Sequence, residues 1–373
     1  MSDRKLLIVG GGFAGMSLAI RMRALGWAVD LVELDPQWRV YGAGITITGP
    51  TYRASKRLGI IDELVALGYG SHAGVRICAP DGHVIVQMPP RPIEPGLPTN
   101  GGIMRPVMQD ILSRRTRASG ADVRLGVTLQ SFTEDDDGVR AVTSDGEVRD
   151  YTLVVGADGA FSSVRTLLFP GAAKPKYTGQ YCWRLVAHRP PEIDGVHIYM
   201  AGPITAGLTP ASATQMYMFL LHPLAAKERV DEATQWRRLQ ELMAPFSGLM
   251  GTLRDGLSAS SAIICRPLEA ILLPRPWHRG RVLLIGDAVH ATTPHLASGA
   301  GIAIEDGLVL SEELAREADV ERALARFEER RWERCRIVVE NSVRIGEMEQ
   351  THGDPAALNA LMAESEAALR QDI

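Results

Sequence analysis

Glycine residues near the N-terminus have the spacing that binds the pyrophosphate of a dinucleotide. The stretch from residue 10 fits the pattern G-x-G-x-x-G. In this pattern the first glycine permits a tight turn, the second lets the backbone approach the pyrophosphate, and the third allows a helix to pack closely on a strand. The first amides of that helix can then donate to phosphate oxygens. The pattern predicts dinucleotide contacts from Gly10, Gly12, Phe13, Ala14 and Gly15.

An acidic residue follows at the distance expected for ribose recognition. Glu33 comes about 20 residues after the glycines, at the end of a second apolar run over residues 28–32. At this place a carboxylate can accept hydrogen bonds from ribose hydroxyls. An acid rather than an arginine fits a ribose without a 2′-phosphate. The pair of motifs therefore favours FAD or NAD as the ligand.

Two later segments place glycine and aspartate directly after apolar runs. The first reads VVGADGAFSSVR over residues 154–165, and the second reads RVLLIGDAVH over residues 281–290. In the second segment a strand should end at Ile285, where Gly286 lets the backbone close on a cofactor. Asp287 then offers a carboxylate to ribityl or ribose hydroxyls. The three segments together predict one cofactor site assembled from distant parts of the chain.

In this order and spacing the three segments resemble those of the class A, p-hydroxybenzoate hydroxylase-like flavoprotein monooxygenases. The resemblance runs from residue 5 to about residue 345 and includes features of the branch that oxygenates hydroxypyridine carboxylates and salicylate. It implies FAD as the cofactor and NAD(P)H as a transient co-substrate. The chain has a single G-x-G-x-x-G motif, which fits a protein without a separate domain for NAD(P)H. It also assigns further residues to the FAD site: Arg39, Arg105, Asp158, Gly286 and Asp287.

The family's flavin loop, P-x-x-G-Q-G-x-N-x-A-x-E-D, is matched in part. Residues 294–306 read PHLASGAGIAIED, so Ala297, Ser298 and Gly301 stand where the family has Gly, Gln and Asn. The resemblance places Gly299 and Ala300 beside the flavin. The backbone amides at this helix start can still stabilise negative charge on the flavin N1–C2=O edge.

The resemblance also suggests residues on the substrate side. Arg184, on a strand that lines the family's substrate cavity, suits a carboxylate or phenolate because its planar fork binds such groups in a bidentate manner. Tyr217 is a candidate donor to a ring hydroxyl. His295, next to Pro294, is a candidate base. Each of these side chains has a structural alternative, namely solvent contact, packing or a bond to its own loop.

The elements that would position these residues alternate between two kinds of structure. Apolar runs over residues 6–9, 153–155 and 282–285 are typical of buried parallel strands. Between them lie short alternating strands such as residues 215–221, and helices are expected over residues 305–314, 320–350 and 355–370. We predict an α/β fold, with a Rossmann-like FAD-binding domain, an inserted mixed or antiparallel β-sheet substrate domain, and C-terminal helices.

This interpretation gives a discontinuous domain organisation. The predicted FAD-binding domain comprises residues 1–75, 100–175 and 275–345. The predicted substrate domain comprises residues 76–99 and 176–274, and residues 346–373 form a C-terminal helical tail.

Composition excludes several classes of protein. The chain has 373 residues, and its 40 basic against 44 acidic residues give a net charge of −4 without charge blocks, so it offers no electrostatic support for nucleic acid or membrane binding. No apolar stretch approaches a membrane span. The four cysteines form neither a CxxC nor a zinc pattern, which favours a reduced, cytoplasmic protein without a metal site. We expect a monomer or homodimer.

The resemblance implies a single-component FAD-dependent monooxygenase. It would use NAD(P)H and O₂ to hydroxylate a small aromatic or heteroaromatic substrate through a flavin C4a-hydroperoxide. Two alternatives stay open from the sequence: a flavin oxidase or dehydrogenase on the same fold, and a non-catalytic flavin-dependent redox sensor. Incorporation of oxygen-18 into product distinguishes the first alternative, and substrate-stimulated NAD(P)H consumption distinguishes the second.

Overall fold

The fold opens with the predicted strand–helix–strand unit. The computed structural model describes residues 4–39, 42–135 and 138–373. Strand β1 (Lys5–Val9) leads through the glycine loop into helix α1 (Phe13–Ala24), and β2 (Ala28–Glu33) pairs in parallel with β1. Gly26, at a φ of +83°, follows α1 and turns the chain toward β2.

Five parallel strands and one antiparallel edge strand form the first sheet, in the order β18-β19-β12-β1-β2-β8. The four strands not yet introduced are β8 (Asp122–Leu125), β12 (Leu153–Gly156), β18 (His278–Arg279) and β19 (Val282–Leu284). Strands β12 and β1 at its centre are apolar apart from Lys5 at the start of β1, because helices cover both faces of a parallel sheet. Leu6, Leu7 and Ile8 accordingly have no exposed surface. This is the predicted α/β fold.

A second sheet of seven strands has the order β17-β13-β16-β15-β14-β5-β6. It is mixed, because β14 and β5 pair in parallel whereas the other neighbours are antiparallel. Its strands are β5 (Val75–Cys78), β6 (Val84–Met88), β13 (Lys176–His188), β14 (Val196–Ala201), β15 (Ile204–Pro210), β16 (Gln215–Pro223) and β17 (Ile263–Ala270). Strands from both segments of the predicted substrate domain thus share one sheet.

The two faces of this seven-stranded sheet have different partners. On β13, Tyr181, Trp183 and Leu185 point into an apolar cluster closed by helices α6 (Gln235–Leu242) and α7 (Gly248–Asp255). Since side chains alternate along a strand, Gln180 and Arg184 point to the opposite face. That opposite face looks toward the first sheet and its helices, and we call it the inner face.

Two three-stranded sheets and several short helices connect these layers. The sheets are β3 (Gly44–Thr48), β7 (Asn100–Met104) and β4 (Tyr69–Ser71), and β11 (Val148–Tyr151), β10 (Val139–Thr143) and β9 (Leu129–Glu134). The helices are α2 (Gly49–Leu58), α3 (Ile61–Leu67), α4 (Arg105–Ala118), α5 (Ser163–Leu168) and α8 (Asp287–His290), with the 3-10 turn η1 (Pro294–Leu296).

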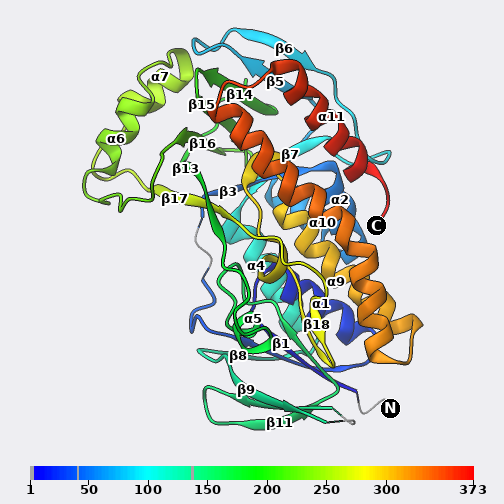
Figure 1. Ribbon diagram of the computed structural model, residues 1–373. Coiled ribbons are helices and arrows are strands. Elements are labelled where there is room, and N and C mark those ends of the chain that lie inside the picture. Colours follow the sequence, from blue (N-terminus) through cyan, green and yellow to red (C-terminus); the bar gives the residue numbers. More distant parts are fainter. Residues whose placement is uncertain (1–3, 40–41, 136–137) are drawn as a thin grey trace.

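Three helices end the chain: α9 (Gly299–Arg316), α10 (Val320–Gln350) and α11 (Pro355–Arg370). The long α10 runs from beside α9 to the seven-stranded sheet, so it links the two main sheets (Figure 1). The bounds of α10 and α11 agree with the predicted helices, and α9 begins six residues before the predicted Glu305.

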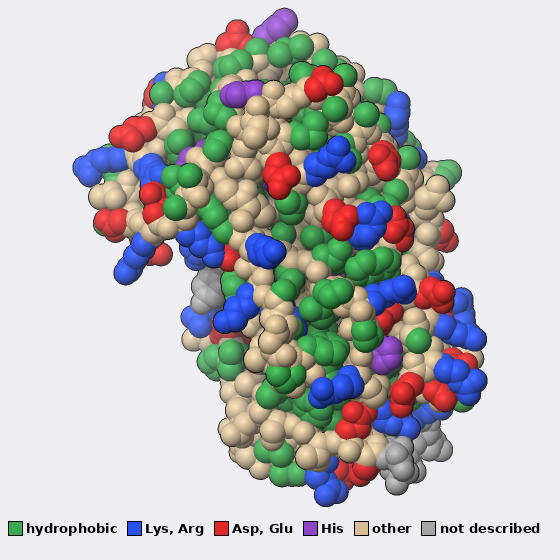
Figure 2. All heavy atoms as spheres, viewed as in Figure 1, with side chains coloured by type: hydrophobic (Ala, Val, Ile, Leu, Met, Phe, Trp, Pro, Cys, Tyr) green, Lys and Arg blue, Asp and Glu red, His purple; other side chains and the backbone are tan. Residues whose placement is uncertain are grey.

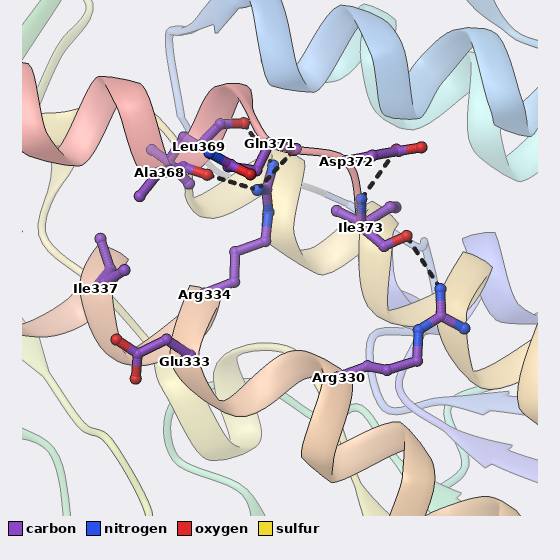
Figure 3. Close-up of a pocket in the computed structure, with 9 residues that line it drawn as sticks. All are labelled: Arg330, Glu333, Arg334, Ile337, Ala368, Leu369, Gln371, Asp372 and Ile373. Carbon is purple, nitrogen blue, oxygen red and sulfur yellow. Dashed lines mark hydrogen bonds between the residues drawn. The ribbon is translucent and has the colours of Figure 1, made fainter.

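Arginines fasten the end of α11 to the rest of the molecule (Figure 3). Arg334 of α10 donates hydrogen bonds to the carbonyls of Ala368, Leu369 and Gln371, and Arg330 donates to that of Ile373. Arg53 of α2 donates to the carbonyl of Arg370 at 2.8 Å. The last carbonyls of a helix lack intrahelical donors, and these guanidinium groups supply them. The hollow drawn in Figure 3 therefore belongs to the docking of the tail.

On the surface drawn in Figure 2, acidic and basic side chains are interspersed without a large patch of one sign. Within the described ranges, no helix combines the length and apolar character that crossing a membrane requires.

Candidate active site

The three glycines of the first motif occupy three different environments. Gly10 has a φ of +109°, and a Cβ atom there would lie 2.4 Å from the carbonyl oxygen of Ala157. A Cβ on Gly15 would lie 2.1 Å from the carbonyl oxygen of Gly10, so α1 and β1 pack too closely for any side chain. A Cβ on Gly12 would meet nothing within 4 Å. The loop is thus tight on its protein side and open at Gly12, as a pyrophosphate requires.

The predicted ribose acceptor is fixed by backbone amides. Glu33 Oε2 accepts the N–H of Gly11 at 2.7 Å, and Oε1 accepts the N–H of Asp35 at 2.8 Å. Each carboxylate oxygen has more than one acceptor site, so capacity for ribose hydroxyls is left. The indole N–H of Trp38 donates to the carbonyl of Gly11 at 2.8 Å and holds the loop from the other side.

Arg39 lies beside this loop. Its guanidinium pairs with Asp35 at 2.9 Å, and together with Trp38 and Gln109 it lines a hollow next to the glycine motif. The family stretch that begins at Arg39 includes residues 40–41, which lie outside the described residues. A contact between Arg39 and FAD stays a prediction.

Asp158 has a local task that the sequence did not indicate. Its carboxylate accepts the N–H groups of Ser163 at 2.7 Å and Val164 at 3.1 Å, at the start of α5. Arg165 of the same segment donates to the carbonyl of Ala288 at 2.7 Å and so ties α5 to α8. The segment therefore positions the turn at Gly286 through backbone contacts. Direct binding of FAD by Asp158 stays a prediction.

The turn at Gly286 and Asp287 leaves one carboxylate without a protein partner. Gly286 has a φ of +63°, and a Cβ there would lie 2.8 Å from the Cβ of Ala14. Among the described residues, the Asp287 carboxylate makes no hydrogen bond. Its side chain is exposed, yet it lies deep enough in the fold that restricted hydration raises its pKa, an effect that the charges of His290 and Arg105 oppose.

Arg105 is an unpaired cation near Asp287. Its guanidinium lies over the ring of Phe13, 5.4 Å from the ring centre, and its buried Nε has no hydrogen-bond partner in the described chain. Burial lowers the pKa of Arg105, and the charge of Asp287 opposes this shift. Two polar side chains without partners among the described residues, on segments that contact Phe13 and Ala14 just after the open Gly12, fit a dinucleotide with phosphates and hydroxyls. These residues therefore fit FAD.

Behind this turn every buried charge is paired. Asp306 accepts the N–H of Gly286 at 2.8 Å, lies 2.7 Å from His290 Nε2, and pairs with Arg331 at 2.8 Å. Arg331 and Arg334 both pair with Glu305. Cys335 Sγ also lies close to His290 and Asp306, but the neighbouring Arg331 already supplies the positive charge that a metal ion would bring.

The flavin loop departs from the family pattern at three positions, and at one of them, Gly301, the structure gives a steric reason. Ala297 takes a left-handed conformation with a φ of +47°, at the position where the family has glycine. The hydroxyl of Ser298 donates to the carbonyl of Leu296 at 2.7 Å and closes the turn. A Cβ on Gly301 would lie 2.4 Å from Thr51 Oγ1, so α2 occupies the space of the family's Asn side chain. Gly299 and Ala300 begin α9, and its first amides are open to an acceptor.

Two predicted substrate residues share the inner face, but only one has a free side chain. Arg184 is half-buried, lies opposite Phe219 of β16, and forms neither a hydrogen bond nor an ion pair with any described residue. Tyr217 is buried, and its hydroxyl is hydrogen-bonded to Thr46 of β3. If Tyr217 hydrogen-bonds to a substrate, its hydroxyl has to bond to Thr46 and to the substrate at the same time.

His295 lies in η1 directly after Pro294. Its Nδ1 is 2.9 Å from Thr293 Oγ1, and its Nε2 lies 3.7 Å from Glu349 Oε2. Burial lowers the pKa of His295 to about 4, so the ring is neutral at pH 7.

Sequence reasoning missed Glu349, because a single glutamate in the charge-rich α10 looks like any surface residue. The role of Gln180 was missed as well, although its strand was singled out.

The glycine loop, the carboxylates of Glu33 and Asp287, and the parallel sheet behind them suit a bound dinucleotide. The chain belongs to the family described as FAD binding domain, whose model matches residues 3–342. It is an FAD-dependent monooxygenase, with NAD(P)H as the co-substrate typical of the family.

Relatives cover nearly the whole chain. A putative FAD-dependent monooxygenase of Bacillus subtilis is 31% identical over 99% of each chain. The 2-heptyl-3-hydroxy-4(1H)-quinolone synthase of Pseudomonas aeruginosa is 32% identical over 82% of this chain and 79% of its own. The crystal structure of Klebsiella pneumoniae HpxO with FAD and uric acid matches with a TM-score of 0.82 at 24% identity, over 99% of this chain and 93% of that one, and so shares the fold.

Proposed function

We propose that this monooxygenase hydroxylates a small heteroaromatic compound that carries an anionic or strongly polar group. The observation that carries the proposal is Arg184, a half-buried guanidinium on the inner face that has no partner among the described residues. A cation held partly out of water is stabilised by an anion, and the planar fork of arginine fixes the plane of a carboxylate or enolate as well as its distance.

The inner face changes character along its strands. Next to Arg184 lies an apolar cluster of Cys182, Phe219, Leu221 and Leu268. Beyond it comes Gln180, four residues from Arg184 on β13 and therefore about 13 Å away along the strand. A flat ring system with polar groups at two ends matches this order of charged, apolar and polar side chains. Burial of such a ring against apolar side chains would contribute most of its affinity.

Two relatives support a heterocyclic substrate. One is named for a 4(1H)-quinolone, and the structure of another contains uric acid. Both molecules are planar rings with ring nitrogen and oxygen substituents, and both would meet the polar groups of the inner face.

Bound FAD supplies the redox chemistry with NAD(P)H and O₂, and the side chains of this chain orient the substrate and exclude water. Asp287, Arg105 and the first amides of α9 would hold the cofactor. Arg184 would present one ring carbon to it. The neutral His295, beside Pro294, would accept a proton from the substrate at Nε2. Tyr217, held by Thr46, would fix the edge of the ring.

The test is a screen of hydroxylated benzoates, pyridine carboxylates, quinolones and purines for stimulation of NAD(P)H oxidation by the holoenzyme. The hydroxylated product of the best compound, formed under ¹⁸O₂, should contain one labelled oxygen. Stimulation without incorporated label would instead indicate an oxidase. Stimulation only by uncharged hydrocarbons would contradict the assignment of Arg184.

Three further expectations belong to this proposal. The domain boundaries given above remain a proposal, which the separation of the strands into two main sheets supports except at Val75, where β5 begins. The four cysteines are buried and unpaired, which supports a reducing, cytoplasmic environment. A monomer or a homodimer is expected and is measurable by light scattering.

A further inference from the structure

A group of buried and half-buried polar side chains from three elements lies at the end of the inner face away from Arg184. Gln180 of β13 is 1% exposed, His295 comes from η1, and Glu349 comes from the last turn of α10. Glu349 Oε2 accepts a hydrogen bond from Thr205 Oγ1 of β15 at 3.3 Å. Gln180 Oε1 and His295 Nε2 have no partner in the described chain. We call Gln180, His295 and Glu349 the polar end.

Unpaired buried atoms of this kind need an explanation. Each one is unfavourable if it stays without a hydrogen bond, and native structures contain few of them. Two unpaired atoms beside a third polar group, on the face that carries the unpaired Arg184, indicate a place for a ligand. The separation of 3.7 Å between His295 Nε2 and Glu349 Oε2 is too long for a hydrogen bond, so these two groups do not satisfy each other.

Helix α10 leaves room for the polar end through one glycine. A Cβ on Gly346 would lie 2.8 Å from Gln180 Oε1 and 2.8 Å from His295 Cε1. Any side chain here would displace both groups. Gly346 is buried inside a helix, where glycine is unfavourable by about 1 kcal/mol relative to alanine. The close approach of Gln180 and His295 to Gly346 explains why glycine occupies this position.

The protonation of the polar end determines what it can bind. Burial raises the pKa of Glu349 to about 7 and lowers the pKa of His295 to about 4. The histidine ring is therefore neutral, and in the tautomer that carries its proton on Nδ1, 2.9 Å from Thr293 Oγ1, its Nε2 is an acceptor. Gln180 Oε1 is a second acceptor. Glu349 is protonated in part near pH 7, and it then offers a donor to a carbonyl.

We propose that Gln180, His295 and Glu349 bind the N–H edge of a lactam-type heterocycle, a ring N–H next to or conjugated with a ring carbonyl. The inference rests on the proposed function and specifies its substrate class. The ring N–H donates to Gln180 Oε1 or His295 Nε2, and the Glu349 carboxyl meets the remaining polar atom of that edge. A methyl group on the ring nitrogen removes the donor and collides with the acceptors.

The test uses 4-quinolone and N-methyl-4-quinolone as probes of the FAD-loaded enzyme. Each dissociation constant is measured from the change in flavin absorbance, and KM and kcat are measured where turnover occurs. Loss of one good hydrogen bond corresponds to about tenfold in affinity, so wild-type enzyme should bind the N–H probe at least about tenfold more tightly.

Variants connect that preference to the polar end. Gln180→Leu and Gly346→Ala should abolish most of the preference, and Glu349→Gln, which keeps the shape, should retain part of it. Glu347→Gln is the matched control, because Glu347 is exposed two residues away on α10 and should leave the preference unchanged. FAD content is measured in every variant, so a misfolded variant is recognised.

The outcomes separate the two proposals. If no heterocycle stimulates NAD(P)H oxidation, the proposed function is wrong. If heterocycles stimulate it but wild-type enzyme binds the two probes equally, or binds neither, the polar end does not read an N–H edge and a bound water satisfies those atoms instead. A preference that survives both Gln180→Leu and Gly346→Ala would also overturn the inference.

Discussion

Helix α10 contributes residues to two polar clusters in the interior. The clusters differ in whether their polar atoms have hydrogen-bond partners. In its middle, Arg331 is bonded to Asp306 and Glu305, all three are at most 1% exposed, and every charge has a partner. In its last turn, Glu349 lies with His295 and Gln180, and two of the polar atoms there have no partner.

The difference separates structural residues from residues that face a ligand. A paired buried charge fixes neighbouring elements, and removing one member exposes the penalty of the other. An unpaired buried group costs stability in the free protein, so its removal should affect binding more than folding. The following experiments test this distinction in order of decreasing effect.

Arg331→Met should destabilise the protein most. It removes the guanidinium partner of Asp306, which then keeps only His290, and one of the two arginine partners of Glu305. Breaking such a buried network typically costs about 3–5 kcal/mol. Urea unfolding of the FAD-loaded protein measures the loss. Arg336→Met is the control on the same helix, since its pairs with Glu333 and Glu340 lie at the surface and contribute at most about 1 kcal/mol. A loss below about 1 kcal/mol for Arg331→Met would remove the distinction between the two clusters.

Arg184→Ala should change catalysis without changing stability. FAD content and basal NAD(P)H oxidation should stay near wild type, while KM rises and reducing equivalents go to hydrogen peroxide. Misplacement of the ring by about 1 Å can cost 10²-fold in kcat/KM. Lysine should restore the activity only in part, because a point charge does not fix the ring plane. Unchanged KM and peroxide yield would show that Arg184 faces solvent, and attention would move to Tyr217 and His295.

Glu349→Gln should alter how stability depends on pH. The folded pKa of Glu349 is raised from 4.5 to about 7, so the folded chain keeps a proton that the unfolded chain releases. The stability of wild type relative to Glu349→Gln is therefore greatest below pH 4.5 and should fall by about 2–3 kcal/mol as the pH rises to 7. A flat difference across this range would contradict the assignment.

The histidine of the polar end acts in the opposite sense. The lowered pKa of His295, about 4, means that its contribution to stability is lost as the pH falls from 6.5 toward 4. Wild type and Glu349→Gln both contain His295, so its contribution cancels to first order in the difference between their free energies of unfolding. Urea unfolding at several pH values measures this difference.

Asp287→Ala should weaken FAD binding by about 1–3 kcal/mol, because cofactor hydroxyls lose an acceptor. The apoprotein should be no less stable than wild type, since the Asp287 carboxylate has no hydrogen-bond partner among the described residues and restricted hydration raises its pKa. Equilibrium dialysis of FAD and thermal unfolding of the apoprotein give the two quantities. Glu241→Ala, on the exposed side of α6, is the control. Equal FAD affinity in the two variants would remove Asp287 from the site.

The cofactor half was predictable because its signals are local. Gly10, Gly12 and Gly15 lie within six residues, and each spacing reflects a close backbone approach that no other residue permits. The apolar strands and long helices were predictable for the same reason, since burial on both faces or on one face leaves a periodic pattern.

The substrate half was predictable only in part because its residues meet through tertiary packing. Gln180 and Glu349 are 169 positions apart in the sequence, and the glycine that brings them together, Gly346, has no motif around it. Tyr217 lies on the inner face, and its role as a donor to a ring hydroxyl stays a prediction. Its bond to Thr46 depends on the approach of β3, which no pattern near Tyr217 encodes.

The hydrogen bonds from Arg334 to the carbonyls at the end of α11 couple the docking of the tail to the binding of FAD. Gly286 is bonded to Asp306, Asp306 to Arg331, Arg331 to Glu305, and Glu305 to Arg334, whose guanidinium also holds the carbonyl of Leu369. FAD binding and tail docking share this network. If FAD binding stabilises the docked tail, then docking of the tail strengthens FAD binding by the same free energy. Saturation with FAD should therefore slow proteolytic cleavage at residues 351–354, and a loosened tail should release the cofactor more readily.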